Sequence, residues 1–393
     1  MEKGITSMGK VKVLYIHHSE SQSGAARSLS FLIDRLDKEK YEPYVLCMFD
    51  EEGNRELFES VGAKLLYKKI SPWHGSTVSG MSFIIFLHNV KYLLPTLFGM
   101  KEILEKVQPD IVHLNSTCLC FAAAAIKRWK KDLSIVCHVR EPLLDGFWGD
   151  ILRKVNEPNV DYYVAIEKYD ADSLHTALPV EVVPNFVDFS VYNERVESKC
   201  LFDELEIPYD HKILLYLARI SPQNGALECV NALKDYLTNN QEVHFCVVGA
   251  DFDNRSNYLD EIIAVSKILP NNLHILPFRT DVPNVIASSD VMLVPFQTPH
   301  FARSVIEAAA MGVPSIGTCV GGLEELIVHG KTGFLVDPKS FEGLAEYCDE
   351  LLDQGKRASF VKNAIEYAHE NFDAEKNSNR TFEIYEKLLG NKG

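Results

Sequence analysis

Basic residues are scarce in this chain of 393 residues, which holds 40 Lys and Arg against 55 Asp and Glu. The formal net charge of −15 argues against a general nucleic-acid-binding protein, because a phosphate backbone demands an excess of cations. The deficit is uneven, since residues 1–190 carry a net charge of −3 and residues 191–393 carry −12. The amino-terminal half is therefore better able to approach an anionic surface.

The sequence also contains no Cys-x-x-Cys pair and no recognisable metal-binding motif. The nine cysteines are scattered, their number is odd and no Cys-x-x-Cys pair occurs. This pattern favours buried thiols in a reducing compartment over disulfide bonds or a zinc site. No cluster of histidines and carboxylates is legible as a metal site, and no Gly-x-Gly-x-x-Gly follows the first predicted strand, which argues against a nicotinamide dehydrogenase. We expect neither a metal ion nor an organic cofactor.

Long apolar runs are rare as well, and only residues 78–100 raise the question of a membrane. Their apolar side chains recur at helical spacing, but polar residues interrupt the run and Pro95 bends it. The segment is too broken for a membrane span. Two interpretations remain open: a helix packed within its own domain, or a helix with one face in the plane of a membrane. Because no amino-terminal run resembles a signal peptide, we expect a cytoplasmic protein, with any membrane contact peripheral and on the inner face.

Short apolar strands alternate with helical patterns along the first half of the chain. The predicted strands cover residues 11–18, 41–49, 110–116, 134–141 and 161–167. Alternation of this kind implies a mostly parallel sheet with helices on both faces. Polar residues crowd the carboxyl ends of these strands, where open α/β sheets bind ligands. They are His17, His18, His113, Asn115, His138, Arg140 and Glu141.

A second series of strands follows the stretch 180–192, whose proline and turn residues we interpret as a connection between domains. Its elements are strands at 212–220, 243–250, 272–278, 290–296, 313–318 and 332–337, with helices over 341–390. The chain thus predicts two doubly wound, Rossmann-like α/β domains that face a central cleft. We expect an amino-terminal domain at 1–185 and a carboxy-terminal domain at 186–370. A final helix at 371–393 is expected to pack back on the first domain.

Four stretches resemble motifs of the retaining glycosyltransferases of family 4, which have the two-domain GT-B architecture. "LARISPQNG" (217–225) resembles a Gly-Arg-x-x-x-x-Lys-Gly loop, and "PNFVD" (184–188) resembles a Pro-Asn-Gly-Val-Asp linker. "PHFARSVIEAAAMGVPSIGTCVGGLEELI" (299–327) is similar to the Glu-x7-Glu segment of the family. "HGKTGFLVD" (329–337) is similar to its Gly-x-Thr-Gly-Leu-Leu-Val strand. Order and spacing match over nearly the whole chain.

Glu307 stands inside the apolar run 305–311, where a carboxylate needs either water or a hydrogen-bonding partner. The resemblance implies that this residue, the second glutamate of the motif, binds the ribose hydroxyls of a nucleotide. The first glutamate, which accepts from the donor sugar, falls on Pro299. Either the donor lacks or alters that hydroxyl, or His300 or a water accepts the bond instead. The resemblance also implies an anion site at the backbone amides of Phe301, Ala302 and Arg303.

Arg219 matches the diphosphate-binding arginine of the family, whereas the matching lysine is replaced by Asn224. The loss of one cation weakens the stabilisation of a departing diphosphate. Phe278 and Arg279 end a predicted strand in the region where the nucleobase lies in the family. Phe278 is as readily a core residue as a stacking partner.

In the first half, "SGAAR" (23–27) resembles a Gly-Gly-Ala-Glu-Arg loop near the donor diphosphate, and Gly24 still permits close backbone approach. His138 lies where the family places a histidine beside the donor sugar. Together with Arg219 and Glu307, it completes the residues to which the resemblance assigns catalysis. The candidates for the acceptor side are His113, Asn115, Arg140 and Glu141.

The resemblance implies a retaining, metal-independent glycosyltransferase. It would move a sugar from a UDP- or GDP-sugar to a glycan or lipid-linked acceptor, in polysaccharide or glycoconjugate synthesis. Two alternatives stay open. A non-catalytic subunit that binds a sugar nucleotide is permitted by the changes at positions 224 and 299. A nonhydrolysing sugar-nucleotide epimerase has the same fold, although the linker at 184–188 and the strand at 329–337 argue against it.

Overall fold

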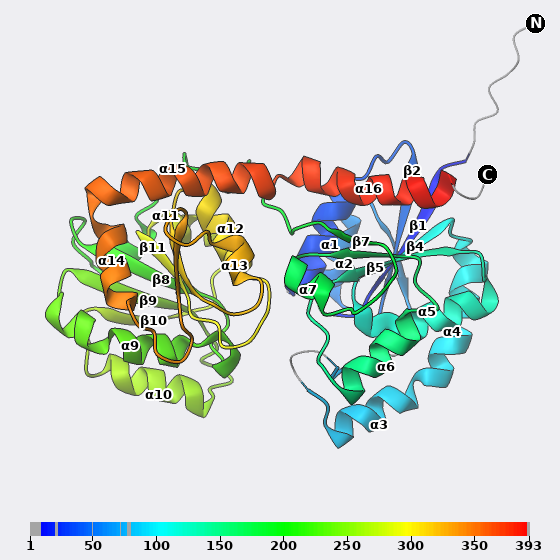
Figure 1. Ribbon diagram of the computed structural model, residues 1–393, viewed down its shortest axis with the longest axis horizontal. Helices are drawn as coiled ribbons and strands as arrows, with labels where there is room; N and C mark the ends of the chain where they lie inside the picture. Colours follow the sequence, from blue (N-terminus) through cyan, green and yellow to red (C-terminus); the bar gives the residue numbers. More distant parts are fainter. Residues whose placement is uncertain (1–8, 20–22, 49, 71, 77–79, 391–393) are drawn as a thin grey trace, which may run out of the picture. The chain divides into compact units, whose positions relative to one another are not determined.

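The chain folds into two units, and it passes between them after Asn185 and again after Ala374. The amino-terminal unit comprises Met1–Asn185 with Glu375–Gly393, and the carboxy-terminal unit comprises Phe186–Ala374. The computed structural model describes residues 9–19, 23–48, 50–70, 72–76 and 80–390 (Figure 1). Outside these ranges lie residue 49 of a predicted strand, residues 78–79 of the apolar segment and residues 391–393 of the predicted last helix.

Seven parallel strands form the sheet of the amino-terminal unit, in the order β3-β2-β1-β4-β5-β6-β7. Their bounds are β1 Val11–His17, β2 Tyr41–Cys47, β3 Lys64–Tyr67, β4 Ile111–Leu114, β5 Ser134–Val139, β6 Tyr162–Ala165 and β7 Val180–Val182. The central strands are buried on both faces, which explains why they read as continuous apolar runs. The order reverses direction between β1 and β4, and doubly wound sheets bind ligands at such a switch point.

Helices cover both faces of this sheet. They are α1 Gly24–Asp34, α2 Glu52–Glu59, α3 Phe83–Lys91, α4 Leu93–Val107, α5 Cys120–Trp129, α6 Phe147–Asn156, α7 Lys168–Asp172 and the last helix of the chain, α16 Ala374–Gly390, with a 3-10 turn, η1, at Thr117–Leu119. Helix α16 contributes buried Phe382, Ile384 and Tyr385 to the core that contains Val13 and Tyr15. The last helix is thus part of the amino-terminal unit.

The carboxy-terminal unit has a six-stranded parallel sheet in the order β10-β9-β8-β11-β12-β13. Its strands are β8 Lys212–Leu217, β9 Val243–Ala250, β10 Leu273–Pro277, β11 Val291–Val294, β12 Ser315–Thr318 and β13 Gly333–Val336. Its helices are α8 Cys200–Glu204, α9 Ala226–Asn239, α10 Asn257–Ser266, α11 Val282–Ala287, α12 Arg303–Ala310, α13 Leu323–Leu326, α14 Leu344–Leu352 and α15 Gln354–Asn371, with a 3-10 turn, η2, at Pro222–Asn224. The switch point lies between β8 and β11.

The predicted strands are present, and the structure adds two more. Strand β3 at 64–67 was not predicted, because it lies at the edge of the sheet with only Leu66 buried and so lacks the continuous apolar run of the central strands. Strand β7 occupies the first part of the predicted connection 180–192, where its residues 180–182 extend the sheet beside β6. The connection proper therefore begins after the sheet has gained its last strand.

Candidate active site

The first half of the candidate site is the loop after β8, which carries Arg219. The carbonyl oxygen of Arg219 accepts hydrogen bonds from the Tyr216 hydroxyl at 2.8 Å and from the Asn224 side-chain amide at 2.7 Å. The side chain of Arg219 is exposed, and within the described ranges its guanidinium forms no ion pair. A cation that is held through its main chain and left unpaired is available to an anion. Asn224 is occupied in positioning that main chain.

The loop after β8 lies against the segment that follows β11. Gly225 has a φ of 70°, and a Cβ at this position would stand 1.8 Å from the carbonyl oxygen of Pro295. The amide of Gln297 donates to the carbonyl of Gln223 at 2.8 Å. Only glycine permits this approach. The switch point of the carboxy-terminal sheet thus brings the Arg219 loop beside the segment that leads to α12.

The amino terminus of α12 is open to an anion through its backbone. The helix begins at Arg303, and its cap residue Ala302 offers no side-chain acceptor. The first amides of a helix have no carbonyl partner within it, and together with the helix dipole they attract negative charge. The predicted amides of Phe301, Ala302 and Arg303 therefore lie at a helix amino terminus, as the motif requires.

Glu307 is buried on α12, with 8% of its surface exposed. Arg303 lies one helical turn earlier, and its Nε is 3.3 Å from Oε1 of Glu307. The ion pair offsets the desolvation of the carboxylate. Glu307 therefore has a protein partner, whereas the sequence predicted a ribose as its partner. The signal was present in the sequence, because residues four apart face each other on a helix. The role proposed for Glu307 stays a prediction.

Pro299 and His300 are held by neighbours from the same region. A Cβ on Gly321 would stand 2.6 Å from Cβ of Pro299, so the proline packs against the Gly-rich turn after β12. The ring of His300 stacks on Phe296 at 3.9 Å between centroids, and its Nδ1–H donates to the Thr298 carbonyl at 2.9 Å. Burial lowers the pKa of His300. In the neutral ring Nε2 is then an acceptor, the function that Pro299 lacks.

Phe278 and Arg279 follow the edge strand β10, away from the β8–β11 switch point. Phe278 is 60% exposed, so it is no core residue. The guanidinium of Arg279 forms two hydrogen bonds of 2.7 Å to Asp281 and an ion pair of 2.5 Å to Glu204. These carboxylates raise its pKa further. Arg279 thus ties the loop to α8, and its proposed contact with a donor stays a prediction.

A polar network occupies the switch point of the amino-terminal sheet. Asn115, directly after β4, donates to the carbonyl of Ala25 at 3.1 Å and lies 3.0 Å from Nδ1 of His17. Its carbonyl oxygen accepts from Nε of Arg140 at 2.7 Å, and Arg140 also donates to Asn185 at 3.2 Å. Two of the predicted acceptor-side residues, Asn115 and Arg140, are therefore joined in one network.

Two serines of this network, Ser19 and Ser23, were not predicted as site residues. His17 reaches Ser19 at 3.2 Å, and Ser19 lies 2.7 Å from Ser23. Ser23 caps α1 by accepting from the amide of Ala26 at 3.1 Å, which leaves Gly24 as the first residue of the helix. The serines carried a usable signal, since Ser followed by small residues before an apolar run is a helix start. Glu141 is exposed and stands outside these bonds.

A second chain of contacts buries His138. Nδ1 of His138 lies 3.2 Å from Nε2 of His113, and Nδ1 of His113 lies 2.6 Å from the hydroxyl of Tyr385 on α16. Nε2 of His138 has no hydrogen-bond partner among the described residues, although the side chain is almost fully buried. An unpaired buried polar atom is rare in proteins and marks a place for a ligand or a water.

Burial sets the protonation of these histidines. Together with the smaller effect of the Arg140 charge, it lowers the pKa of His17 and of His113 to about 3. The pKa of His138 is also depressed, first by burial and then by Arg140 and His113. The three rings are therefore neutral at pH 7, and each has one donor and one acceptor nitrogen. Across the part of the chain that the structure describes, no three His, Cys, Asp or Glu residues are grouped to hold a metal ion.

Two parallel-sheet, Rossmann-like units, each with polar groups at its switch point, define the class of GT-B glycosyltransferases. The fold matches solved structures of this class. Anabaena HepE in complex with UDP and glucose aligns over 96% of this chain and 99% of its own, with a TM-score of 0.77 and 20% identity. The apo lipopolysaccharide outer core galactosyltransferase WaaB aligns over 96% and 100%, with a TM-score of 0.69 and 17% identity.

The family follows from the sequence comparisons. The model described as Glycosyltransferase Family 4 matches residues 22–191, and the one described as Glycosyl transferases group 1 matches residues 198–367. N-acetyl-alpha-D-glucosaminyl L-malate synthase of Bacillus anthracis is 30% identical over 360 residues, which cover 86% of this chain and 91% of that relative. Spore coat protein SA of Bacillus subtilis is 28% identical over 72% of this chain and 80% of its own length. The chain belongs to the family-4 glycosyltransferases, and the predicted family and fold are confirmed.

Proposed function

We propose that the protein is a retaining, metal-independent glycosyltransferase that uses a nucleoside diphosphate sugar. One observation carries the proposal. The Arg219 cation, which forms no ion pair among the described residues, and the amino terminus of α12 lie at the same switch point. Both features suit a diphosphate, whose charge grows as the glycosidic bond breaks. UDP and UDP-glucose occupy the solved complexes of HepE, a protein of the same fold.

In the mechanism that we propose, the diphosphate departs toward Arg219 and the amides at 301–303. Glu307 holds the ribose of the donor, and His138 contacts its sugar through Nε2. An acceptor hydroxyl attacks the anomeric carbon on the same face, and its proton passes to an oxygen of the departing diphosphate. No protein base is then required, which agrees with the neutral histidines near β4 and β5. We propose a glycan or lipid-linked acceptor and action in the cytoplasm.

A panel of donors tests the reaction without knowledge of the acceptor. Slow hydrolysis of UDP-glucose, UDP-GlcNAc or GDP-mannose should release nucleoside diphosphate, and EDTA should leave the rate unchanged. Release of the sugar first as the anomer present in the donor, followed by NMR, would support retention. The inverted anomer would refute retention, and loss of activity in EDTA with rescue by manganese would refute metal independence.

The alternatives give different products in the same assay. An epimerase would convert the donor to a second sugar nucleotide, with no release of diphosphate. A non-catalytic subunit would bind UDP or GDP in a thermal-shift experiment and turn over none of the donors. This control is needed because Asn224 and Pro299 replace two residues of the family motifs, which permits a non-catalytic subunit.

The choice of donor sugar is expected to depend on position 299. Pro299 provides no acceptor for a hydroxyl at position 3 or 4 of the sugar, whereas Nε2 of His300 is an acceptor nearby in the chain. We expect an N-acetylated or deoxy sugar to be preferred over glucose, and Pro299→Glu to shift the preference toward glucose. If wild type prefers UDP-glucose and His300→Phe abolishes that preference, His300 has replaced the glutamate. If neither substitution alters the preference, position 299 does not contact the sugar.

A further inference from the structure

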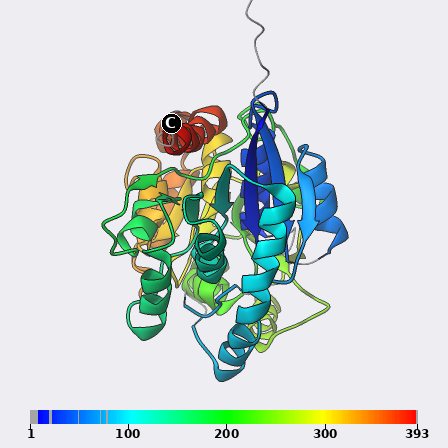
Figure 2. The same ribbon diagram turned by 90° about the vertical axis from the view of Figure 1, so that its right-hand side faces the viewer.

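The outer face of α3 and α4 gathers more exposed large apolar side chains than any other element of the described residues. We define the α3–α4 face by Phe83, Ile84, Leu87, Val90, Leu94 and Phe98, which are between 43% and 80% exposed. Their spacing places them along one side of the two helices, and Figures 1 and 2 show both helices on the outside of the amino-terminal unit. Soluble monomers rarely leave an apolar patch of this kind uncovered.

The opposite side of the same helices is fixed to the protein. The Asn89 side chain donates to the carbonyl of His74 at 2.9 Å and accepts from the amide of His74 at 3.3 Å. Phe86 packs edge-on against Trp73, with ring centroids 6.1 Å apart. On α4, Met100 is fully buried in the core. The helix pair is therefore held along the surface of its unit, with only one side exposed.

Length and composition alone would allow Phe83–Val107 to cross a membrane, since its mean hydropathy reaches 1.3 over an 18-residue window, of which 22% is buried. The low burial shows that this is no ordinary core helix. A span would, however, have to pull Asn89 and Met100 out of the unit and expose their contacts. The anchoring favours a helix that lies in the plane of a bilayer, with the exposed side in lipid.

Cations and aromatic rings border the α3–α4 face. The ammonium groups of Lys69 and Lys91 lie 4.9 Å and 5.4 Å from the centre of the Tyr92 ring, and that of Lys101 lies 5.0 Å from the Trp129 ring. Such borders are typical of the membrane interface, where aromatic rings lie at the level of the headgroups and lysines contact anionic lipids. Lys101 also lies 3.7 Å from Glu105, so Lys69 and Lys91 are the cations of this border that pair with no carboxylate among the described residues.

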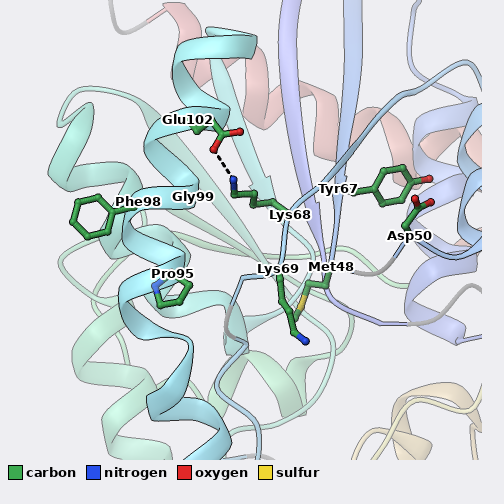
Figure 3. A pocket seen from close by; sticks show the side chains of 9 residues that line it. All are labelled: Met48, Asp50, Tyr67, Lys68, Lys69, Pro95, Phe98, Gly99 and Glu102. Atoms are coloured by element: carbon green, nitrogen blue, oxygen red, sulfur yellow. Dashed lines mark hydrogen bonds and ion pairs between the residues drawn. The ribbon is translucent and has the colours of Figure 1, made fainter.

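A cavity of about 570 Å³ opens beside this border, between α4 and the end of β3 (Figure 3). Lys68 and Glu102, which both line it, form an ion pair of 2.5 Å. Asp50, also at its wall, pairs with Arg55 at 2.6 Å. Lys69 also lines the cavity, and it pairs with no carboxylate among the residues that the structure describes. After these pairings, one cation remains for an anionic guest.

We propose that the α3–α4 face lies in the interfacial layer of a membrane that contains anionic phospholipid, with Lys69 in the cavity bound to a lipid phosphate. The proposal concerns where the enzyme works and does not depend on the identity of its donor. Loss of membrane binding would leave donor hydrolysis intact, and loss of hydrolysis would leave membrane binding intact.

Sedimentation with vesicles tests the face. The full chain should bind vesicles of phosphatidylcholine with 30% phosphatidylglycerol, bind pure phosphatidylcholine far more weakly, and lose affinity as salt rises. The triple variant Ile84→Ser/Leu94→Ser/Phe98→Ser should bind at least tenfold more weakly. Ile268→Ser is the matched control, because Ile268 is 61% exposed on the other unit, and it should bind like wild type. Donor hydrolysis, measured in parallel, confirms that each variant is folded.

The role of Lys69 has a separate test and control. Lys69→Gln should reduce the preference for phosphatidylglycerol over phosphatidylcholine, whereas Lys267→Gln, at an exposed lysine of the carboxy-terminal unit, should not. Equal binding by wild type and the triple variant would overturn the proposal. So would retention on vesicles after alkaline carbonate, which indicates a span. A dimer that the triple variant dissociates, without vesicle binding by wild type, would assign the face to a second copy of the chain.

Discussion

The two units share one topology and fill its switch point in opposite ways. Between β1 and β4, buried neutral side chains such as His17 and Asn115 hydrogen-bond mainly to one another. Between β8 and β11, an exposed arginine that forms no ion pair among the described residues lies beside the amino terminus of α12, whose cap residue offers no side-chain acceptor. The first arrangement orients neutral groups, and the second accommodates negative charge.

The comparison also shows that net charge is a poor guide to an anion site. Residues 191–393 carry −12 of the net charge of −15, yet they contain both Arg219 and the amino terminus of α12. Local donors act at hydrogen-bonding distance, whereas scattered surface carboxylates are screened by salt beyond about 10 Å. In the amino-terminal unit, which has no excess of cations, Lys69, Lys91 and Lys101 instead border an apolar face.

Acidification should give the largest difference between the two units, because it should destabilise the amino-terminal unit more. In the amino-terminal unit His17, His18 and His113 have pKa values lowered to about 3, chiefly by burial, whereas in the carboxy-terminal unit burial lowers the pKa of His244 to about 4 and also lowers those of His274 and His300. Unfolded histidines bind protons below about pH 6.5. Stability is thus full above pH 6.5 and falls as the pH moves toward 3, by about 2 kcal/mol for each such histidine between pH 7 and pH 5. Hydrogen exchange should show β4 and β5 losing protection before β9 and β11. Equal loss in both units would contradict the difference.

Removal of the exposed cation should break the charge-accommodating site. We expect Arg219→Ala to lower kcat by about 100-fold or more, by analogy with the loss of one oxyanion donor. Arg255→Ala is a suitable control, because Arg255 pairs with Asp260 on the surface of the same unit. Steady-state kinetics of donor hydrolysis give the answer. A rise in KM alone would show that Arg219 contacts the ground state only.

Glu307→Gln should weaken the binding of the nucleoside diphosphate by about 1.5–3 kcal/mol, the value of hydrogen bonds to a charged group. Calorimetric titration measures this loss. Because Arg303 would lose its buried partner, the melting temperature should fall as well. The double variant Arg303→Gln/Glu307→Gln separates the two effects, since it should recover stability without recovering affinity. Unchanged affinity in Glu307→Gln would exclude a ribose contact.

The smallest expected effect tests the neutral, orienting character of the amino-terminal switch point. Tyr385→Phe removes the hydroxyl that lies 2.6 Å from Nδ1 of His113 and so frees the tautomer of His113 and His138. We expect a loss of about 1 kcal/mol in transition-state stabilisation, the worth of one hydrogen bond. The Tyr385 hydroxyl donates to that of Tyr15 and so accepts from Nδ1–H of His113, which favours the protonated ring. Its loss should shift the acid side of the kcat/KM profile toward lower pH, which a purely structural change would not cause. Tyr163→Phe, at another buried tyrosine of the unit, should leave the profile unchanged.

Most of the fold was predictable because local sequence patterns indicate strands and helices. The strand at Val243–Ala250 has the predicted bounds, since apolar periodicity and flanking turn residues act over a few positions. Strands β3 and β7 escaped prediction because both lie at edges of the sheet: only Leu66 of β3 is buried, and the three residues of β7 are all half-buried, so neither forms a continuous apolar run. Of the site, the motif spacing located Arg219 and Glu307 without showing what holds them.

The sequence by itself determined the family, the two parallel sheets and the positions that carry the motifs, because spacing along the chain is preserved in the sequence. Tertiary structure alone decided the partners. Tyr385 meets His113 across 272 residues, and Gly225 meets Pro295 only because β8 and β11 are neighbours in the sheet. It also decided that one side of α3 and α4 is anchored and the other exposed. Such pairings depend on burial and geometry shared by distant segments, and no local pattern records them.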